Sequence, residues 1–298
     1  MDRNIKVLIL GSSGMLGHAL FNRLSEDFEV FGWQRSDKKI TLNPHWSERV
    51  ITGLEMSDTV AVEAKVRKLK PDYVINCMGV IKQFKRTPRA EFVAVNSMWP
   101  HTLDAICSHA GVKLIHFSTD CVFDGAKGNY VESDPPSASD DYGLSKYLGE
   151  VISGSEALTL RTSIIGHEIG RSLSLIDWFL TQRTSVQGFR QAIYTGLPTV
   201  EVADFLRRYM HNSWDLKGLY HLCSHPISKY DLLTLVGEIY GHKLEIIADD
   251  EVRIDRSLNG SKLRADTGVE YPDWRGLVEK MHKFHEDLAP LYLNGMEG

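Results

Sequence analysis

Residues 5–24 join a short apolar run to a glycine-rich turn and then to an amphipathic stretch. Ile5 to Leu10 has the composition of a strand buried on both faces, and the turn GSSGMLG follows at residues 11–17. Glycines let the backbone approach a pyrophosphate, and the N-terminus of the next helix supplies free N–H groups. The spacing is GxxGxxG rather than GxGxxG, and a turn that serves only packing is the alternative. Its place between a strand and a helix favours a dinucleotide-binding site.

The end of the second expected strand bears on which dinucleotide is bound. Glu29 to Trp33 predicts that strand, and Gln34, Arg35 and Ser36 follow it. A fold that prefers NAD usually carries an acidic residue here for the ribose 2′-hydroxyl, whereas Arg35 and Ser36 suit a 2′-phosphate. NADP(H) is therefore favoured over NAD(H). Asp37 keeps the alternative open, because a strand that ends two residues later would reverse the argument.

Strand and helix signals continue to alternate through the first half of the chain. The expected elements are helices at residues 57–70 and 92–110 and strands at residues 72–76 and 113–117. Such alternation predicts an α/β fold with a doubly wound parallel sheet. Ligands bind these sheets beyond the carboxyl ends of the strands, where Gly11, Asn76 and Thr119 should converge on one crevice.

Tyr142 and Lys146 carry the first catalytic hypothesis. They lie four residues apart, so on a helix they share one face. A tyrosine hydroxyl has an ordinary pKa of about 10, and a neighbouring ammonium lowers that pKa toward working pH. Thr119 follows the strand at 113–117 and offers a hydroxyl that can hold a substrate carbonyl against the same proton donor. A tyrosine and a lysine at this spacing also recur by chance on solvated helices. Together with the glycine turn, the three residues predict a site that adds or removes hydrogen at a carbon–oxygen bond.

Composition narrows the class of protein. With 298 residues and 43% hydrophobic content, the chain can form a large core and one or two domains. No run approaches the roughly 20 apolar residues of a membrane span, and the N-terminus is unlike a signal peptide. A net charge of −5 without a dense Lys/Arg block argues against nucleic acid as a partner. The four cysteines lack CxxC spacing and are expected to be reduced, as in a cytoplasmic protein.

The second half of the chain has weaker signals. Helices are expected at residues 173–182, 201–212, 228–240 and 275–288, and a short strand at 218–222. His282, His285 and Glu286 are grouped in the last helix. Without a further ligand at suitable spacing they predict a solvated helix face, and no metal site is expected.

Most of the chain resembles the extended short-chain dehydrogenase/reductase family. The matching motifs are GSSGMLG at 11–17, NCMG at 76–79, Val95-Asn96, STD at 118–120 and YGLSK at 142–146. Within that family, STDCVFDG at 118–125 and RTSIIG at 161–166 are most similar to the dTDP-4-dehydrorhamnose reductase branch. The resemblance implies an NADP(H)-binding Rossmann domain at residues 1–166. It also implies a smaller C-terminal α/β substrate-binding region at residues 167–298, parts of which are free to return to the Rossmann domain.

The resemblance also implies roles for individual residues. Tyr142 would give a proton to the sugar C4 oxygen as NADPH gives hydride to C4. Lys146 would bind the nicotinamide ribose and lower the Tyr142 pKa, and Thr119 would bind the reacting oxygen. The implied cofactor-binding residues are Gly11, Ser13, Gly14, Met15, Gly17, Arg35, Ser36, Glu55, Met56, Cys77, Gly79, Asn96 and Lys146. The implied substrate-binding residues are Lys82, Ser118, Asp120, Cys121 and Thr199.

The expected activity is NADPH-dependent reduction of a nucleotide-linked 4-keto-6-deoxyhexose for polysaccharide biosynthesis, with dTDP or UDP left open as the nucleotide. Related 4,6-dehydratases carry Asp and then Glu after the threonine, so Cys121 after Asp120 disfavours dehydration. The reductase branch usually has tyrosine in place of Cys121, which leaves the exact sugar open. An epimerase that retains NAD and a non-catalytic NADP-binding regulatory subunit, as in methionine adenosyltransferase, are the alternatives. The expected partner is a nucleotide-diphosphate deoxysugar, with a homodimer as an open possibility.

Overall fold

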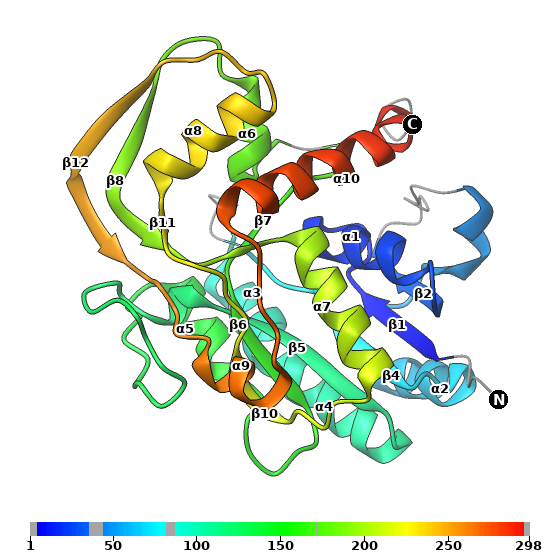
Figure 1. Ribbon diagram of the computed structural model, residues 1–298. Helices are drawn as coiled ribbons and strands as arrows, with labels where there is room; N and C mark the ends of the chain where they lie inside the picture. The colour runs from blue at the N-terminus through cyan, green and yellow to red at the C-terminus, as the bar shows by residue number, and fades with distance from the viewer. Residues whose placement is uncertain (1–4, 36–43, 82–86, 171, 295–298) are drawn as a thin grey trace.

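A seven-stranded parallel sheet forms the larger body of the protein (Figure 1). The computed structural model describes residues 5–35, 44–81, 87–170 and 172–294. The strands follow the order β10-β6-β5-β4-β1-β2-β3, and every neighbouring pair is parallel. Their bounds are β1 Lys6–Leu10, β2 Glu29–Trp33, β3 Val50–Ile51, β4 Tyr73–Asn76, β5 Lys113–Thr119, β6 Leu158–Thr162 and β10 Gly218–His221. The chain reverses direction across the sheet between β1 and β4, the point at which doubly wound folds bind ligands.

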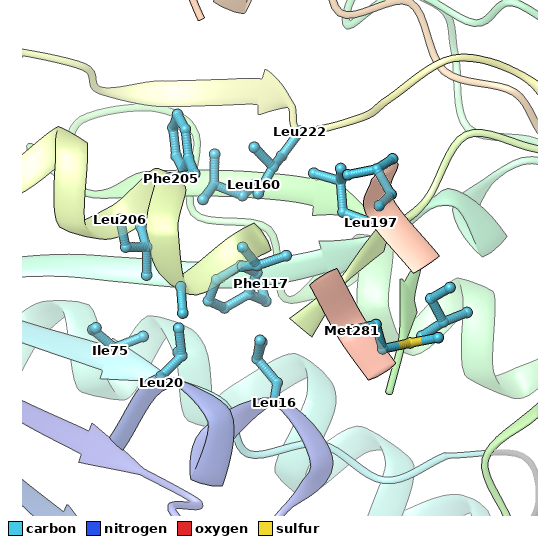
Figure 2. Packing of buried hydrophobic residues seen from close by; sticks show 14 of the residues in the cluster. Leu16, Leu20, Ile75, Phe117, Leu160, Leu197, Phe205, Leu206, Leu222 and Met281 are labelled. Carbon is cyan, nitrogen blue, oxygen red and sulfur yellow. The ribbon is translucent and has the colours of Figure 1, made fainter. Parts of the chain in front are cut away.

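Helices cover both faces of this sheet. On one face lie α1 (Met15–Leu24) and α7 (Thr199–Asn212), and on the other α2 (Thr59–Leu69) and α4 (Trp99–Ala110). Figure 2 shows Leu16 and Leu20 of α1 lying toward the strand residues Ile75 and Phe117, and Phe205 of α7 beside Leu160 of β6. Successive strand residues alternate between the two cores, as they must in a sheet buried on both faces.

Further helical segments connect the strands of the large sheet. The helical run α3 (Arg89–Phe92), η2 (Val93–Met98) and α4 is continuous, and its middle part is a π-helix. The short 3-10 helices η1 (Pro44–Arg49) and η3 (Asp120–Val122) lie directly before β3 and directly after β5, and α5 (Asp141–Leu148) comes after a long loop. A π-helical turn inside an α-helix often marks a functional site.

A smaller sheet of order β11-β8-β12 forms the second body. Its strands are β8 Val186–Tyr194, β11 Ile227–Ser228 and β12 Ile246–Asp255, with β8 antiparallel to β11 and parallel to β12. The helices α6 (Leu175–Thr181) and α8 (Lys229–Ile239) lie beside it, and α10 (Trp274–Asn294) runs between it and the larger body (Figure 1). The remaining elements are the paired strands β7 Ile164–Ile165 and β9 Leu197–Pro198 and the helix α9 (Ser261–Thr267).

The predicted fold class is confirmed, but the chain crosses between the two bodies more than once. After residue 166, α7 returns to pack on α1, and β10 joins the edge of the large sheet beside β6. The division expected at residue 166, with parts of the later region free to return to the Rossmann domain, stays a prediction. The strands β8 and β12 have no counterpart among the elements expected from the sequence.

Helix ends follow local chemistry. Asp58 caps α2 by accepting a hydrogen bond from the Ala61 N–H, and Ser228 caps α8 in the same way at Asp231. Gly111 ends α4 with φ +66°, a left-handed conformation that favours glycine.

Candidate active site

A cavity of about 610 Å³ lies beyond the carboxyl ends of β1, β4 and β5 and reaches the smaller body. Its wall on the larger body includes Gly14, Cys77, Thr119, Tyr142 and Lys146. Residues from four separate segments of the first half of the chain thus meet in one place. This is the crevice at which the strand ends were expected to converge.

Thr119 and Tyr142 face each other across this wall. Thr119 is the last residue of β5 and is 6% exposed, and its hydroxyl accepts a hydrogen bond from the Cys121 N–H at 3.1 Å. A hydrogen bond also joins the Thr119 side chain to Tyr142. Asp140 caps α5 through the Gly143 N–H and so fixes the first turn of the helix that carries Tyr142.

Lys146 lies one helical turn after Tyr142 and is almost completely buried. Its ammonium donates a hydrogen bond to the Phe117 carbonyl at 2.6 Å, which ties α5 to β5. Burial lowers the pKa of Lys146 to about 8, while the nearby Glu150 carboxylate opposes that shift.

The Tyr142 pKa differs in direction from the sequence-based expectation. Burial raises it, and Cys121 and Asp120 add to the rise, while the hydrogen bond with the Thr119 side chain lowers it. The expected lowering by Lys146 does not prevail, because burial is the largest influence on the Tyr142 pKa. The Lys146 ammonium donates its hydrogen bond to the Phe117 carbonyl. Tyr142 is therefore a protonated phenol at neutral pH, the form that a proton donor requires.

A buried ion pair supports the strand end below Tyr142 and Lys146. The guanidinium of Arg161 on β6 binds the Glu150 carboxylate through two hydrogen bonds of 2.7 and 2.8 Å, and both side chains are at most 2% exposed. The Ser118 hydroxyl donates to the same carboxylate at 2.7 Å. Ser118 lines the cavity, but its side chain is already committed to this network.

The glycine turn has the shape of a dinucleotide cradle. Gly11 has φ +80°, and a Cβ atom on Gly17 would lie 2.1 Å from the Gly11 carbonyl oxygen. Only glycine allows that approach of α1 to the turn. Gly14 is the N-cap of α1, makes no side-chain capping bond and is exposed on the cavity wall. These features fit a pyrophosphate placed at the N-terminus of α1.

The structure brings half of the predicted site residues to this cavity. Those on its wall are Gly14, Met15, Cys77, Gly79, Ser118, Thr119, Asp120, Cys121, Tyr142 and Lys146. Gly11, Ser13 and Gly17 belong to the adjoining turn without lining the cavity. Burial strongly raises the pKa of the Cys77 thiol, so this side chain is neutral beside Lys146.

Other predicted cofactor residues lie toward β2. Arg35 is exposed two residues after β2 ends, and Glu55 is exposed in the segment whose Leu54 carbonyl accepts a hydrogen bond from the Trp33 indole. Met56 is half-buried and packs on the core between the sheet and α2. Ser36 and Lys82 lie outside the described residues.

Asn96 and Thr199 have no surface on the cavity. Asn96 is completely buried and makes hydrogen bonds to both backbone groups of Val80 and to the Ser145 hydroxyl. It therefore joins the π-helical turn, the segment after β4 and α5. Thr199 is 3% exposed at the start of α7 and packs on Gly166, so the geometry gives no support for a substrate contact.

Sequence reasoning missed the wall on the smaller body. That wall includes Glu168, Tyr194 of β8, Lys229 of α8, Ile254 of β12 and Arg256. No periodic pattern predicted β8 or β12, so no sequence signal placed these side chains near Tyr142.

Histidines join the two bodies beside this site. The His18 ring nitrogen Nδ1 contacts the Gly14 carbonyl at 2.9 Å. His167 stacks on His285 with ring centroids 3.6 Å apart, and His282 lies against Tyr240. The expected solvated face at His282 and His285 is therefore wrong, because both rings pack in this contact. Among the residues that the structure describes, no cluster of His, Cys, Asp or Glu is suited to hold a metal ion.

No helix within the described ranges is long and apolar enough to cross a membrane.

Known proteins resemble this chain along most of its length. The probable low-salt glycan biosynthesis reductase Agl14 of Haloferax volcanii is 30% identical over 177 residues, which are 57% of this chain and 57% of that protein. The chain thus spans little more than half of that relative. The dTDP-4-dehydrorhamnose reductase of Sinorhizobium fredii is 26% identical over 93% of this chain and 96% of its own length. Methionine adenosyltransferase 2 subunit beta of Xenopus tropicalis is 28% identical over 79% of this chain and 72% of its own.

Solved structures share the fold. The dTDP-4-dehydrorhamnose reductase of Bacillus anthracis in complex with NADP has a TM-score of 0.77 over 95% of this chain and 100% of that chain, at 19% identity. The Bordetella bronchiseptica enzyme WbmG in complex with NAD has a TM-score of 0.79 over 96% and 95%, at 18% identity. The RmlD substrate binding domain family matches residues 5–285. With the fold, the glycine turn and the Tyr142–Lys146 pair in place, this match shows that the chain belongs to the RmlD substrate binding domain family.

Proposed function

We propose that this protein catalyses the NADPH-dependent reduction of a nucleotide-linked 4-keto-6-deoxyhexose. The observation that carries the proposal is the meeting of Thr119, Tyr142 and Lys146 on one cavity wall beside the glycine turn. A carbonyl oxygen placed between the Thr119 and Tyr142 hydroxyls would have two donors as its negative charge develops. Such preorganised donors stabilise the transition state more than the ground state.

Proton transfer falls to Tyr142. Its raised pKa keeps the phenol protonated before the reaction, and an alkoxide is a stronger base than a phenolate, so transfer from Tyr142 to the reduced oxygen is favourable. The phenolate left behind is close to the Thr119 hydroxyl and one helical turn from the Lys146 ammonium. Both groups stabilise its negative charge.

The cofactor would lie along the glycine turn. Gly11, Gly14 and Gly17 would hold its pyrophosphate, and Lys146 its nicotinamide ribose. Bound NADPH would supply the hydride to the sugar carbon. Arg35, exposed after β2, would meet the 2′-phosphate that distinguishes NADPH from NADH. Apolar side chains such as Val80, Ile164 and Ile254 line the same cavity and would limit access of water.

The test is NADPH consumption by the purified protein with dTDP-linked and UDP-linked 4-keto-6-deoxyhexoses offered separately. We expect oxidation of NADPH with one of the two sugars, which would also identify the nucleotide. The proposal is wrong if NADPH binds but neither sugar, nor its N-acetylated analogue, causes its consumption.

A second candidate is a non-catalytic NADP-binding subunit. It is favoured by the alignment with methionine adenosyltransferase 2 subunit beta, which spans 79% of this chain. Under this alternative NADPH binds without turnover, and the protein is recovered with a partner enzyme. The presence of Thr119, Tyr142 and Lys146 together supports the reductase.

A further inference from the structure

We propose that Lys229 and Arg256 form a subsite for the diphosphate of a nucleotide-linked substrate. This inference rests on the proposed function, because it extends the same cavity from the reacting carbon to the nucleotide. Both residues lie on the wall that the smaller body contributes.

Lys229 is a cation in an apolar setting. It is the first residue of α8, and its ammonium lies over the rings of Trp178, at 5.4 Å, and Phe189, at 5.1 Å. No hydrogen bond or ion pair joins it to another of the described residues. Burial lowers its pKa. A half-buried ammonium without a carboxylate partner costs free energy, which an anionic ligand would offset.

Arg256 is held closer to the reacting groups. Its Nε atom donates to the Phe123 carbonyl at 2.8 Å, and one terminal nitrogen makes a long contact of 3.8 Å to the Cys121 sulfur. These contacts orient the planar guanidinium beside the Thr119–Tyr142 wall. Within the described chain no carboxylate pairs with it, so the rest of its fork remains available to a phosphate.

The acidic groups of the cavity do not neutralise this pair. The Glu168 carboxylate accepts hydrogen bonds from the Leu173 and Ser174 N–H groups and is used in shaping its own loop. Asp120 accepts a hydrogen bond from Thr119. The cavity therefore combines a reductive end on the larger body with two unneutralised cations on the smaller one.

This arrangement suits a sugar attached to a diphosphate. With the keto carbon at Tyr142, the phosphate on the anomeric carbon would meet Arg256 first. Lys229 would then bind the diphosphate farther along the wall, and its three rotatable N–H donors tolerate more than one phosphate position. A neutral sugar without a phosphate would gain nothing from either residue.

The test is the dissociation constant of UDP and of dTDP, measured by calorimetry on the wild-type protein and four variants. Lys229→Met and Arg256→Met remove one charge each, Lys229→Arg keeps the charge, and Lys283→Met removes an exposed charge on α10. For the nucleotide that binds better, we expect roughly a tenfold or greater loss of affinity in the first two variants, the size of a lost charge-assisted hydrogen bond. Lys229→Arg should keep most of the affinity, and Lys283→Met should equal the wild type.

The NADPH dissociation constant is measured on the same samples as a control for the fold. It should change less than about twofold in every variant. The subsite is overturned if the wild type binds neither nucleotide, if Lys229→Met and Arg256→Met keep its affinity, or if they lose NADPH affinity to the same extent. If binding of UDP or dTDP depends on Lys229 but no sugar nucleotide is turned over, the reductase proposal is wrong and the subsite proposal stands. If Lys229→Met and Arg256→Met both turn over the sugar nucleotide with the wild-type KM, the reductase proposal stands and the subsite proposal is wrong.

Discussion

Burial gives the two key side chains of α5 opposite shifts in pKa. Tyr142 becomes a weaker acid than a free tyrosine, while the pKa of Lys146 falls to about 8. The Lys146 ammonium is therefore protonated below about pH 8 and neutral above it. The groups that face it are the neutral Cys77 thiol at the end of β4, His116 of β5, whose pKa is far below its ordinary value, and the Glu150 carboxylate.

This shift predicts the alkaline limit of activity. In the proposed mechanism the charged Lys146 stabilises the phenolate, so kcat/KM should fall about tenfold for each pH unit above about pH 8. The measurement is the rate of NADPH oxidation at low substrate concentration between pH 6 and 10. Lys146→Met is the control. Its rate should be low at every pH and should not fall further above about pH 8. A wild-type rate that stays level to pH 10 would show that the protonation of Lys146 does not matter.

Arg35 offers a test of cofactor preference. Replacement by aspartate places a negative charge where the 2′-phosphate is expected, so the dissociation constant of NADPH should rise at least about tenfold while that of NADH changes little. Arg35→Lys keeps the charge and serves as the control. Equal effects on the two cofactors would place the 2′-phosphate elsewhere.

Individual residues differ in how far the sequence predicts them. Tyr142 and Lys146 were predictable because helical spacing puts them on one face and because Thr119 and the glycine turn accompany them. Their pKa values were not, because these depend on burial and on the Phe117 carbonyl, which belongs to another element. Lys229 and Arg256 are 27 residues apart in the sequence. They reach one cavity only because the chain folds into the small sheet between them, which the sequence did not predict.

Among the elements, the π-helical turn η2 organises the region behind the site. Its Asn96 side chain satisfies both backbone groups of Val80 and reaches Ser145 on α5. The backbone also approaches closely here, because a Cβ atom on Gly149 would lie 1.8 Å from the Asn96 carbonyl oxygen. This contact holds α5, and with it Tyr142 and Lys146, against the large sheet.

Asn96→Ala should lower the free energy of unfolding by about 2–4 kcal/mol, since it leaves buried backbone groups of Val80 without partners. Asn212→Ala, at the exposed end of α7, is the matched control and should change it by less than about 0.5 kcal/mol. Urea denaturation measures both. Similar values for the two variants would contradict the role given to Asn96.

The strands of the two sheets show why part of the fold escaped prediction. Strands β1, β2 and β4 are short and mostly buried on both faces, so apolar runs identify them. In β12 most residues are exposed, and its sequence IIADDEVRID has no regular alternation. The stability of β12 comes from pairing with β8, a long-range interaction that a local pattern does not contain.

At the scale of the molecule, neutral histidines lie where the two bodies meet. His18 of α1 is 2% exposed and contacts the glycine turn, and burial lowers its pKa from 6.5 to about 4. His285 of α10 is shifted in the same direction, also to about 4. The folded protein therefore binds fewer protons than the unfolded chain between these pH values.

The sign of this linkage predicts acid sensitivity. The contribution of neutral His18 to the free energy of unfolding is fully present above about pH 6.5. It is lost as the pH falls toward 4, by roughly 1.4 kcal/mol per pH unit. In His18→Gln the amide can still donate to Gly14 but does not titrate, so the dependence of unfolding free energy on pH should be shallower by that amount. Urea denaturation between pH 4.5 and 6.5 measures it. Identical slopes would show that His18 is protonated in the folded protein or titrates normally.

The central claim is that Tyr142 delivers the proton in a carbonyl reduction. The most direct measurement compares wild type and Tyr142→Phe for turnover of the accepted sugar nucleotide and for NADPH binding on the same preparations. The account predicts a rate about a hundredfold to ten-thousandfold lower in the variant, with NADPH affinity nearly unchanged. A variant that turns over the sugar at the wild-type rate would contradict it.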